Sequence, residues 1–372
     1  MLFERFLRKK TLMAALALTA AVPSVAKASM LSAAPTADGE NQKLKPGVYY
    51  IVNDKRQKGT DLHVFVDGKG TLHGQHYSSP STDFSDLFLL HAKDGRYTIQ
   101  SLKNAKYVQS VGQNNEVYKT ADDAYKFRIE YQTESSGTGK SYFNIYNSNA
   151  EAWCWHLDAQ KDIVRWYPLR DNGITALGPS EFRFDPVKTL TNEQVLARLA
   201  QLTKVVDPTK DLTKYYQIVS DTYGRAMRED FIVGELSTSG FNSSDYSYYW
   251  KLERLANGRY VFQNAVTGKY IVPQNGQTSR SYTTAEGKGT GFELQRNTDD
   301  PYVLAFEMVD ANNVGIHCAE SQGYHPVGWY THNEANKWVF KEVTLDPAKL
   351  KEQQEAYKTR VDLTKNVDVY AE

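Results

Sequence analysis

Asp94-Gly95-Arg96-Tyr97-Thr98-Ile99-Gln100 is the stretch that decides the fold, because the chain repeats it 163 residues later as Asn257-Gly258-Arg259-Tyr260-Val261-Phe262-Gln263. Continued to Val108 and Ile271, the two segments align over fifteen positions without a gap, and six positions are identical. Other matches lie near the same offset: Tyr49-Tyr50 with Tyr215-Tyr216, Phe127-Arg128-Ile129 with Phe292-Glu293-Leu294, Trp166 with Trp329, and Phe182-Arg183-Phe184 with Trp338-Val339-Phe340. Repetition over this length indicates that a whole domain is duplicated.

Each copy has the pattern of an all-β domain. Short segments with alternating aromatic or β-branched residues are separated by clusters of Gly, Asn, Asp and Ser, which is typical of strands joined by tight turns. In the first copy we expect strands over residues 49–53, 87–90, 97–102, 125–129 and 142–146. Lys93-Asp94-Gly95-Arg96 and Ala256-Asn257-Gly258-Arg259 are expected hairpin turns, because Asp-Gly and Asn-Gly accept positive φ angles.

A weaker period divides each copy into three units of about 40 to 50 residues. Every unit opens with an aromatic strand and closes on a strand of the form aromatic-x-apolar. The first copy opens its units at Gly47-Val48-Tyr49-Tyr50, Gly95-Arg96-Tyr97-Thr98 and Ser141-Tyr142-Phe143-Asn144, and closes them at Phe88-Leu89-Leu90, Phe127-Arg128-Ile129 and Phe182-Arg183-Phe184. The second copy repeats this arrangement, so three lobes per domain are expected.

With three such lobes, each copy resembles a β-trefoil, and specifically the ricin-B-like lectin modules of exported bacterial proteins. The resemblance covers residues 44–187 and 214–343, and it implies two closed barrels of hairpins, each with a three-fold axis and shallow sugar sites in one or more lobes. Ricin-type lobes usually carry Gln-x-Trp near their closing strand. The nearest matches here are Asn336-Lys337-Trp338 and Glu181-Phe182-Arg183-Phe184, so this chain departs from that motif.

The first 28 residues have the features of a cleaved export signal. Four basic residues between positions 5 and 10 precede an apolar run from Leu12 to Val22, and Ala26-Lys27-Ala28 supplies small residues at the cleavage site. The run is shorter than the roughly 20 apolar residues that a spanning helix needs. We therefore expect a secreted or periplasmic protein, or one at the cell surface, with no membrane insertion after signal removal. Residues 29–43, rich in Ala, Ser and Pro, are an expected disordered leader.

One helix is expected after each barrel. Thr191-Asn192-Glu193-Gln194 has the form of a capping box, and Val195, Leu199, Leu202 and Val206 follow on one helical face. This predicts a helical linker over residues 188–213. In the C-terminal helix and tail, residues 344–372, Asp346-Pro347 is a good helix start, and Leu350, Tyr357 and Val361 form a thin apolar stripe.

Charge argues against a nucleic-acid partner. Removal of residues 1–28 takes away five basic residues and one acidic residue, leaving 39 Lys and Arg against 43 Asp and Glu, a net charge of −4. Nucleic-acid binding needs a basic face, since neutralisation of phosphates provides most of the affinity. The expected partners are therefore glycans or a surface or extracellular protein.

The third lobes are the candidate sugar sites, because each contains a His followed downstream by a Trp-Tyr pair. A carbohydrate site needs an aromatic plate for the apolar face of a sugar ring and polar groups for its hydroxyls. An alternative is structural: a Trp at a repeated position is more often core, and each His then only hydrogen-bonds a neighbouring turn. The candidates are Trp155, His156, Asp158, Trp166 and Tyr167 in the first copy, and His317, Glu320, Trp329 and Tyr330 in the second.

The two cysteines are not expected to form a disulfide. Cys154 lies two residues before His156, while Cys318 lies one residue after His317. If these histidines are equivalent, strand alternation places the two thiols on opposite faces. Buried free thiols are the preferred interpretation.

The sequence predicts no catalytic site, metal site or cofactor site. His73-Gly74-Gln75-His76 could hold a metal through two imidazoles, but no ligand cluster at suitable spacing accompanies it, so a solvated loop is favoured. The sequence contains no Gly-x-Ser-x-Gly elbow, His-Glu-x-x-His helix or Cys-x-x-Cys pair. We therefore predict an exported, non-catalytic protein without a cofactor that binds glycans through β-trefoil lobes.

Three other functions stay open. A protease inhibitor would use the long polar stretch 73–86, stiffened by Pro80, as a projecting loop. A protein-binding adhesive component of the envelope is suggested by the 25 tyrosines. A glycoside hydrolase is less favoured, because a β-trefoil usually accompanies a separate catalytic domain and the chain leaves no room for one.

Overall fold

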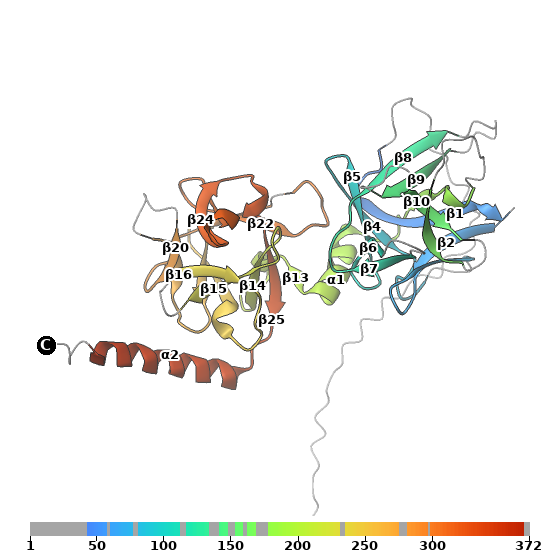
Figure 1. Ribbon diagram of the computed structural model, residues 1–372. Helices are drawn as coiled ribbons and strands as arrows, with labels where there is room; N and C mark the ends of the chain where they lie inside the picture. Colours follow the sequence, from blue (N-terminus) through green and yellow to red (C-terminus); the bar gives the residue numbers. More distant parts are fainter. Residues whose placement is uncertain are drawn as a thin grey trace, which may run out of the picture. The chain divides into compact units, whose positions relative to one another are not determined.

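The computed structural model describes residues 43–57, 60–76, 81–111, 117–133, 141–147, 153–158, 162–168, 178–230, 235–274, 281–296 and 298–367. The expected signal peptide and nearly all of the expected leader lie outside these residues. Strands dominate the described chain, and Figure 1 shows them gathered into two groups, one formed by β1 to β12 and the other by β14 to β25.

Six strands of the first group close into a barrel. They are β1 (Gly47–Gln57), β4 (Phe88–Lys93), β5 (Arg96–Ser101), β8 (Phe127–Thr133), β9 (Ser141–Asn147) and β12 (Arg183–Pro186). Each pairs antiparallel with the next, and β12 returns to β1. One residue pair from each junction shows the circuit: Tyr49 with Phe88, Leu90 with Ile99, Tyr97 with Phe127, Ile129 with Ile145, Phe143 with Phe182, and Phe184 with Ile51.

The second group repeats the circuit. Its barrel strands are β14 (Tyr215–Ser220), β17 (Tyr249–Arg254), β18 (Tyr260–Asn264), β21 (Glu293–Arg296), β22 (Ala305–Val309) and β25 (Trp338–Val343). The corresponding junctions are Tyr216 with Trp250, Leu252 with Phe262, Tyr260 with Phe292, Leu294 with Met308, Phe306 with Trp338, and Phe340 with Ile218. Each residue pair therefore has a counterpart at the equivalent junction of the other barrel.

Three hairpins cap each barrel. In the first domain they are β2 (Thr60–Val66) with β3 (Leu72–His76), β6 (Tyr107–Val111) with β7 (Val117–Ala121), and β10 (Trp153–Leu157) with β11 (Val164–Pro168). In the second they are β15 (Ala226–Asp230) with β16 (Glu235–Ser239), β19 (Tyr270–Pro273) with β20 (Tyr282–Ala285), and β23 (Val314–Ala319) with β24 (His325–Tyr330). A six-stranded barrel capped by three hairpins, one per lobe, is a β-trefoil. The predicted all-β fold with two tandem β-trefoils is confirmed.

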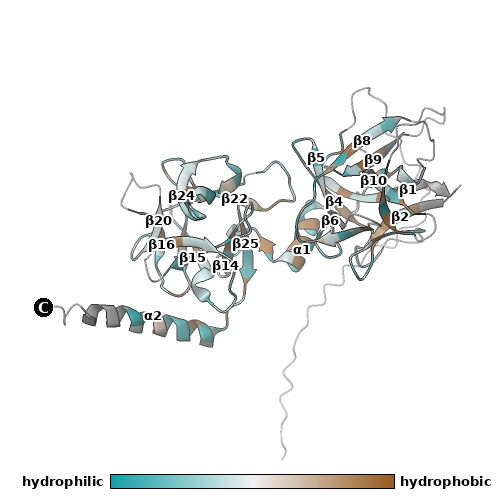
Figure 2. Ribbon diagram, viewed as in Figure 1, coloured by the Kyte–Doolittle hydropathy of each residue, from teal (hydrophilic) through white to brown (hydrophobic). Residues whose placement is uncertain are grey.

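Aromatic side chains from the closing strands fill both barrels. Each barrel contains three such rings that are almost completely buried: Phe88, Phe127 and Phe182 in the first, and Trp250, Phe292 and Trp338 in the second. Large rings suit this position because each removes roughly 150 to 250 Å² from water. Figure 2 shows hydrophobic and hydrophilic residues mixed along the strands, as expected when one face of a strand is buried.

Helix α1 (Asn192–Thr203) follows the first barrel, as predicted. Its capping box is present: the Thr191 hydroxyl accepts from the Gln194 backbone at 3.3 Å, and the Gln194 side chain accepts from the Thr191 backbone at 2.8 Å. Val195 and Leu199 pack on the first barrel, whereas Leu202 is exposed. The helix then ends, and the next residues form the short strand β13 (Val205–Val206), which pairs with β25. The predicted apolar stripe is therefore divided between the two domains.

Helix α2 (Pro347–Val367) follows the second barrel and is mostly hydrophilic (Figure 2). Leu350 and Tyr357 pack on the barrel as predicted. Its Gln354 side chain donates to the Ala265 carbonyl at 2.9 Å, while in α1 the Arg198 side chain donates to the Leu102 carbonyl at 3.0 Å. Both carbonyls come directly after the third barrel strand, so the helices bind equivalent faces. Neither α-helix of the described chain has the length and apolar character needed to cross a membrane.

The two predicted hairpin turns differ in structure. Asp94 and Gly95 have φ angles of 51° and 71° between paired Lys93 and Arg96, which is a tight two-residue turn. In the second copy the connection is longer, since Arg254 pairs with Tyr260 and, of the Asn-Gly pair, only Gly258 has a positive φ. The same dipeptide pattern therefore marks a hairpin in both copies but does not fix its length.

The prediction of a solvated loop at residues 73–76 is wrong, because these residues belong to strand β3. Gly74 explains the difference: a Cβ there would lie 2.8 Å from the Leu157 side chain, so glycine allows β3 to pack against β10. His73 Nε2 lies 3.2 Å from an Asp67 carboxylate oxygen. The histidine is thus placed by the cap and not by a loop.

Replacement of Gly95 by Ala should destabilise the first barrel by about 1 to 2 kcal/mol, because an L-residue at positive φ is strained. The matched control is Gly68→Ala, which also adds a methyl group to open space but at a position without positive φ. Urea unfolding followed by tryptophan fluorescence measures both midpoints. Equal midpoints for the two variants would contradict the assigned turn.

Candidate functional site

The third cap hairpin of each domain holds a histidine beneath an exposed aromatic ring. In the first domain His156 stacks on Tyr167, with ring centroids 4.5 Å apart and an interplanar angle of 23°. In the second domain His317 faces Trp329 at 5.7 Å and 32°. Tyr167 is 52% exposed and Trp329 is 37% exposed, which places them among the few exposed large aromatic side chains of the described residues. Each ring thus has one face against an imidazole and remains partly exposed to solvent.

Strand register identifies the equivalent residues. Tyr167 pairs with the residue two before His156, and Trp329 pairs with the residue two before His317. The counterpart of Trp329 is therefore Tyr167, and not Trp166 as the sequence match indicated. The cause is one additional residue between the histidine and the plate in the second copy, which shifts an ungapped alignment by one position. These two histidine–aromatic pairs are called the third-lobe sites below.

Each histidine is held by a turn that precedes the closing strand of its barrel. His156 Nδ1 lies 3.0 Å from Ser180 Oγ, at the end of the 3₁₀ turn Gly178–Ser180. His317 Nδ1 lies 2.9 Å from Asn336 Oδ1, at the end of the 3₁₀ turn Glu334–Asn336. The prediction that each histidine hydrogen-bonds a neighbouring turn is therefore correct for the Nδ1 atom of both histidines. The same bond fixes the ring under the exposed aromatic residue.

The two tryptophans predicted as site residues of the first copy, Trp155 and Trp166, contact the interior of the domain. Trp155 is fully buried and packs edge-on against Phe127 and Phe182, so it belongs to the core and cannot receive a ligand. Trp166 is partly buried, and its indole nitrogen donates to Ser110 Oγ at 2.6 Å. For Trp155 the core interpretation replaces the predicted role in a site.

The predicted acidic residues are not equivalent to each other. Asp158 lies 3.3 Å from the Nε of Arg165, the residue paired with His156, so its carboxylate is engaged in an ion pair. Glu320 begins the exposed 3₁₀ turn Glu320–Gln322 and accepts from the Tyr324 hydroxyl at 3.4 Å. The side chain of Tyr330 lies outside the described residues. The structure therefore brings together His and aromatic ring in both copies, but no matched carboxylate.

Sequence reasoning missed Ser180 and Asn336 as members of these sites. A signal was present, because each lies two residues before the aromatic residue of the closing strand, Phe182 or Trp338. That spacing is where a Gln-x-Trp motif would place its glutamine. Both residues are polar, and each side chain lies within hydrogen-bonding distance of its histidine.

Among the described cap strands, only those of the third lobes place a histidine and an aromatic residue at these two positions; the first lobe of the first domain has a different pair, Phe65 directly opposite His73, with ring centroids 5.5 Å apart. The residues at the histidine position of the other lobes are Phe65, Gln109, Arg228 and Val272, and those at the plate position are Gln75, Ala121, Ser239 and Ala285. A core requirement would apply to all lobes of a three-fold barrel. This arrangement recurs in the same lobe of both copies and is not shared by all three lobes.

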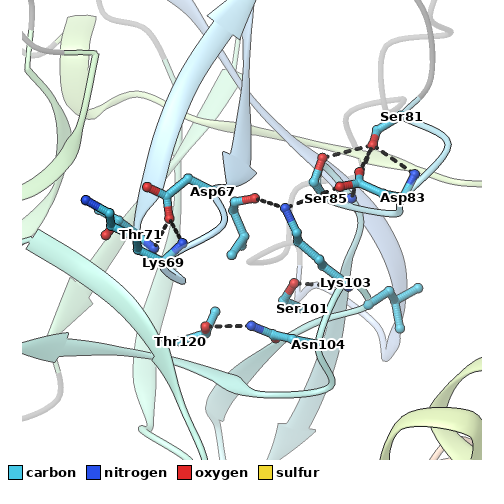
Figure 3. A network of polar contacts seen from close by, with 12 residues as sticks. Asp67, Lys69, Thr71, Ser81, Asp83, Ser85, Ser101, Lys103, Asn104 and Thr120 are labelled. Carbon is cyan, nitrogen blue, oxygen red and sulfur yellow. Dashed lines mark hydrogen bonds and ion pairs between the residues drawn. The ribbon is translucent and has the colours of Figure 1, made fainter.

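A second polar cluster lies in the first lobe (Figure 3). Lys103 Nζ lies 3.2 Å from Asp83 and donates to the Val66 carbonyl at 2.9 Å, while the Ser81 hydroxyl and the Ser85 backbone N–H donate to the same carboxylate. Partial burial raises the pKa of Asp83, but hydrogen bonds from these serines and Lys103 outweigh burial and hold it well below its usual range. Residues 81–86, one end of the proposed inhibitory loop, are therefore tied to the barrel. Residues 77–80 lie outside the described chain.

Both cysteines are free and buried, and they occupy different environments as expected. Cys318 lies in the hydrophobic core of the second barrel, whereas Cys154 lies on the strand face of His156 and contacts the Tyr167 carbonyl. Burial raises the pKa of Cys154 to about 11 and also raises that of Cys318. Neither thiol is suited to nucleophilic chemistry, which needs the thiolate. Within the described chain, no three His, Cys, Asp or Glu side chains form a group that could hold a metal ion.

No protein-family model matches this chain, and no curated protein matches it significantly in sequence. Among solved structures, it is similar to a ricin B-like lectin of Macrolepiota procera in complex with lactose, with a TM-score of 0.31 and 15% identity over 39% of this chain and 100% of the lectin. It is also similar to the Rhizoctonia solani agglutinin, with a TM-score of 0.30 and 18% identity over 39% of this chain and 99% of the agglutinin. A third similar structure is a mosquitocidal holotoxin, with a TM-score of 0.31 and 12% identity over 81% of this chain and 35% of the toxin. This chain therefore spans about a third of the length of that protein.

The buried thiols should not react with Ellman's reagent in the native protein over several minutes, because burial keeps them protonated and out of solvent. In denaturant without reductant, two thiols per chain should react, and one in a Cys154→Ser variant. Free cysteine in the same buffer is the control for the reagent. Rapid reaction of the folded protein, or no reaction after unfolding, would show that the thiol environment is wrongly assigned.

Proposed function

We propose that this chain is an exported, non-catalytic protein that binds carbohydrate through its two third-lobe sites. The observation that carries the proposal is the exposed aromatic ring packed against an anchored histidine, present at the same two positions of both third lobes and at these positions in none of the other four described lobes. A duplicated surface feature of this kind is maintained for a ligand more readily than for packing, since the exposed ring contributes little to the core.

The chemistry of the third-lobe sites suits a sugar. The C–H groups on one face of a pyranose ring pack on an aromatic face such as Tyr167 or Trp329, and the edge of the neighbouring imidazole offers a hydrogen bond to a hydroxyl. A single open ring face on a cap hairpin covers little of the ligand, so each site should bind weakly. Two sites on one chain strengthen binding to a polyvalent glycan through effective concentration.

Export and the lack of catalysis are further parts of the proposal. The basic, apolar and small-residue segments of positions 1–28 support secretion or periplasmic location. The third-lobe sites contain one histidine each and no second matched acid across the plate, and the Ser180 hydroxyl and Cys154 thiol near His156 are both buried. The net charge of −4 that remains after signal removal favours neutral ligands over polyphosphates.

Protein binding is the second candidate function. Phe241 in the second domain is 48% exposed and lies edge-on to Tyr248 and Tyr249, with centroids 5.9 and 6.1 Å away. An exposed ring on a buried aromatic support suits an apolar protein contact. It lies outside the third-lobe sites, so the two candidates are separable by mutation.

A glycan array probed with the protein from residue 29 onward tests the proposal. Tyr167→Ala and Trp329→Ala should each lower the signal for one glycan class by at least about tenfold through loss of bivalent binding, and the double variant should give no signal. Phe241→Ala is the matched control, since it removes an exposed aromatic ring elsewhere, and it should bind like the wild type. Release of sugar from a bound glycan would argue for a hydrolase.

A blank array with folded wild-type protein would contradict glycan binding. Binding that survives the double variant would contradict the location of the sites. Capture of one dominant protein partner, lost in Phe241→Ala and kept in the double variant, would favour the second candidate.

A further inference from the structure

The hydrogen bond between Asn336 and His317 has a defined direction. Asn336 presents its amide oxygen to His317 Nδ1 at 2.9 Å, and an amide oxygen only accepts hydrogen bonds. Nδ1 must therefore carry the hydrogen. A neutral imidazole has one N–H and one bare nitrogen, so this bond leaves Nε2 as the acceptor.

The Asn336 amide lies in a confined, buried position. The side chain is completely buried, and its backbone N–H is fixed by the Asn333 carbonyl at 3.0 Å. The amide nitrogen lies against Gly315, where a Cβ would be only 2.6 Å away. A residue larger than glycine at position 315 would push this amide out of place, so the backbone of β23 shapes the contact.

The exposed side of His317 is the side a ligand would meet. The ring is only partly buried, and in the part of the chain that the structure describes its Nε2 has no hydrogen-bond partner. Trp329 covers one face of the ring and supplies the exposed plate beside it. An acceptor nitrogen next to an aromatic plate complements a group that combines an apolar face with an O–H donor.

We propose that Asn336 is a positioning residue that makes His317 a hydrogen-bond acceptor, so that the second third-lobe site selects neutral sugars by accepting from a ring hydroxyl. This inference rests on the proposed function. A carboxylate or sulfate has no hydrogen to donate, and it would meet the lone pair of Nε2. The site therefore disfavours acidic sugars at this point.

The first third-lobe site lacks this control. Ser180 holds His156 through a hydroxyl, which can either donate or accept, so the protonated nitrogen of His156 is not fixed by its partner. Arg165 and Asp158 also lie beside it as an ion pair, whereas Val327 occupies the position of Arg165 in the second hairpin. The two copies thus differ in specificity, and the selection for a hydroxyl donor belongs to the second.

Nitrogen NMR of the full ¹⁵N-labelled chain tests the inference at about pH 8, where free imidazole is neutral. Long-range proton–nitrogen spectra report which ring nitrogen carries the hydrogen, and His317→Gln identifies the His317 signals. We expect the Nδ1–H form in the wild type and in Asn336→Asp, because a carboxylate also only accepts. Asn336→Ala should shift His317 toward the Nε2–H form. Should Asn336→Ala fail to fold, the wild type and Asn336→Asp decide the assignment.

Titration with methyl glycosides of neutral hexoses and of a hexuronic acid then tests the ligand class, with the His317 Nε2 signal as readout. A neutral glycoside should shift this signal, and Asn336→Ala should weaken its affinity by at least about tenfold. Ser180→Ala is the control, since it alters the other site and should leave the His317 titration unchanged.

The outcomes separate this inference from the proposed function. Glycan binding with His317 in the Nε2–H form, or tighter binding of the uronic acid glycoside at this site, overturns the inference alone. The Nδ1–H form together with a blank array and no response to any glycoside overturns the proposed function and the selection of neutral sugars with it, while the assignment of Asn336 as the residue that orients His317 is upheld.

Discussion

Burial of one aromatic ring at each closing strand is the constraint on which the rest of the structure depends. Phe182 and Trp338 enter the barrel interior at the start of the last strand, and their positions fix the short turns immediately before them. Those turns end in Ser180 and Asn336, which hold the two histidines. Tyr167 then stacks on His156, and Trp329 packs at a tilt against His317. In each domain, burial of the closing-strand ring thus positions the turn residue, whose hydrogen bond positions the histidine against the exposed aromatic ring.

This dependence explains what could be predicted from sequence. Aromatic-x-apolar strands recur because each lobe must fill the same interior, so their spacing predicted three lobes and two barrels. Asp94-Gly95 predicted its hairpin because the backbone there needs positive φ. By contrast, nothing in the local pattern around His73 shows that Leu157 of another lobe lies against Gly74, and this non-local contact makes the segment a strand.

The candidate sites were predicted less completely, for a related reason. The histidines and Tyr167 were found by composition and order, but Trp155 was assigned to the surface because alternation places a residue on a face without saying which face is inside. The engagement of Asp158 with Arg165 depends on the register of β10 with β11. A one-residue difference between the two hairpins misaligned Trp166 with Trp329. Such errors arise wherever pairing across strands, and not sequence spacing, decides which side chains meet.

The two trailing helices show which piece of chain was copied. Arg198 and Gln354 reach the carbonyls of Leu102 and Ala265, which stand at the same point of their barrels, although one helix leads into another domain and the other leads to the tail. The unit of duplication is therefore a barrel together with the helix that seals one of its faces. Each duplicated unit includes the helix that buries an apolar face of its barrel. A further copy could therefore be added in tandem without exposing that apolar face and without a new interface between domains.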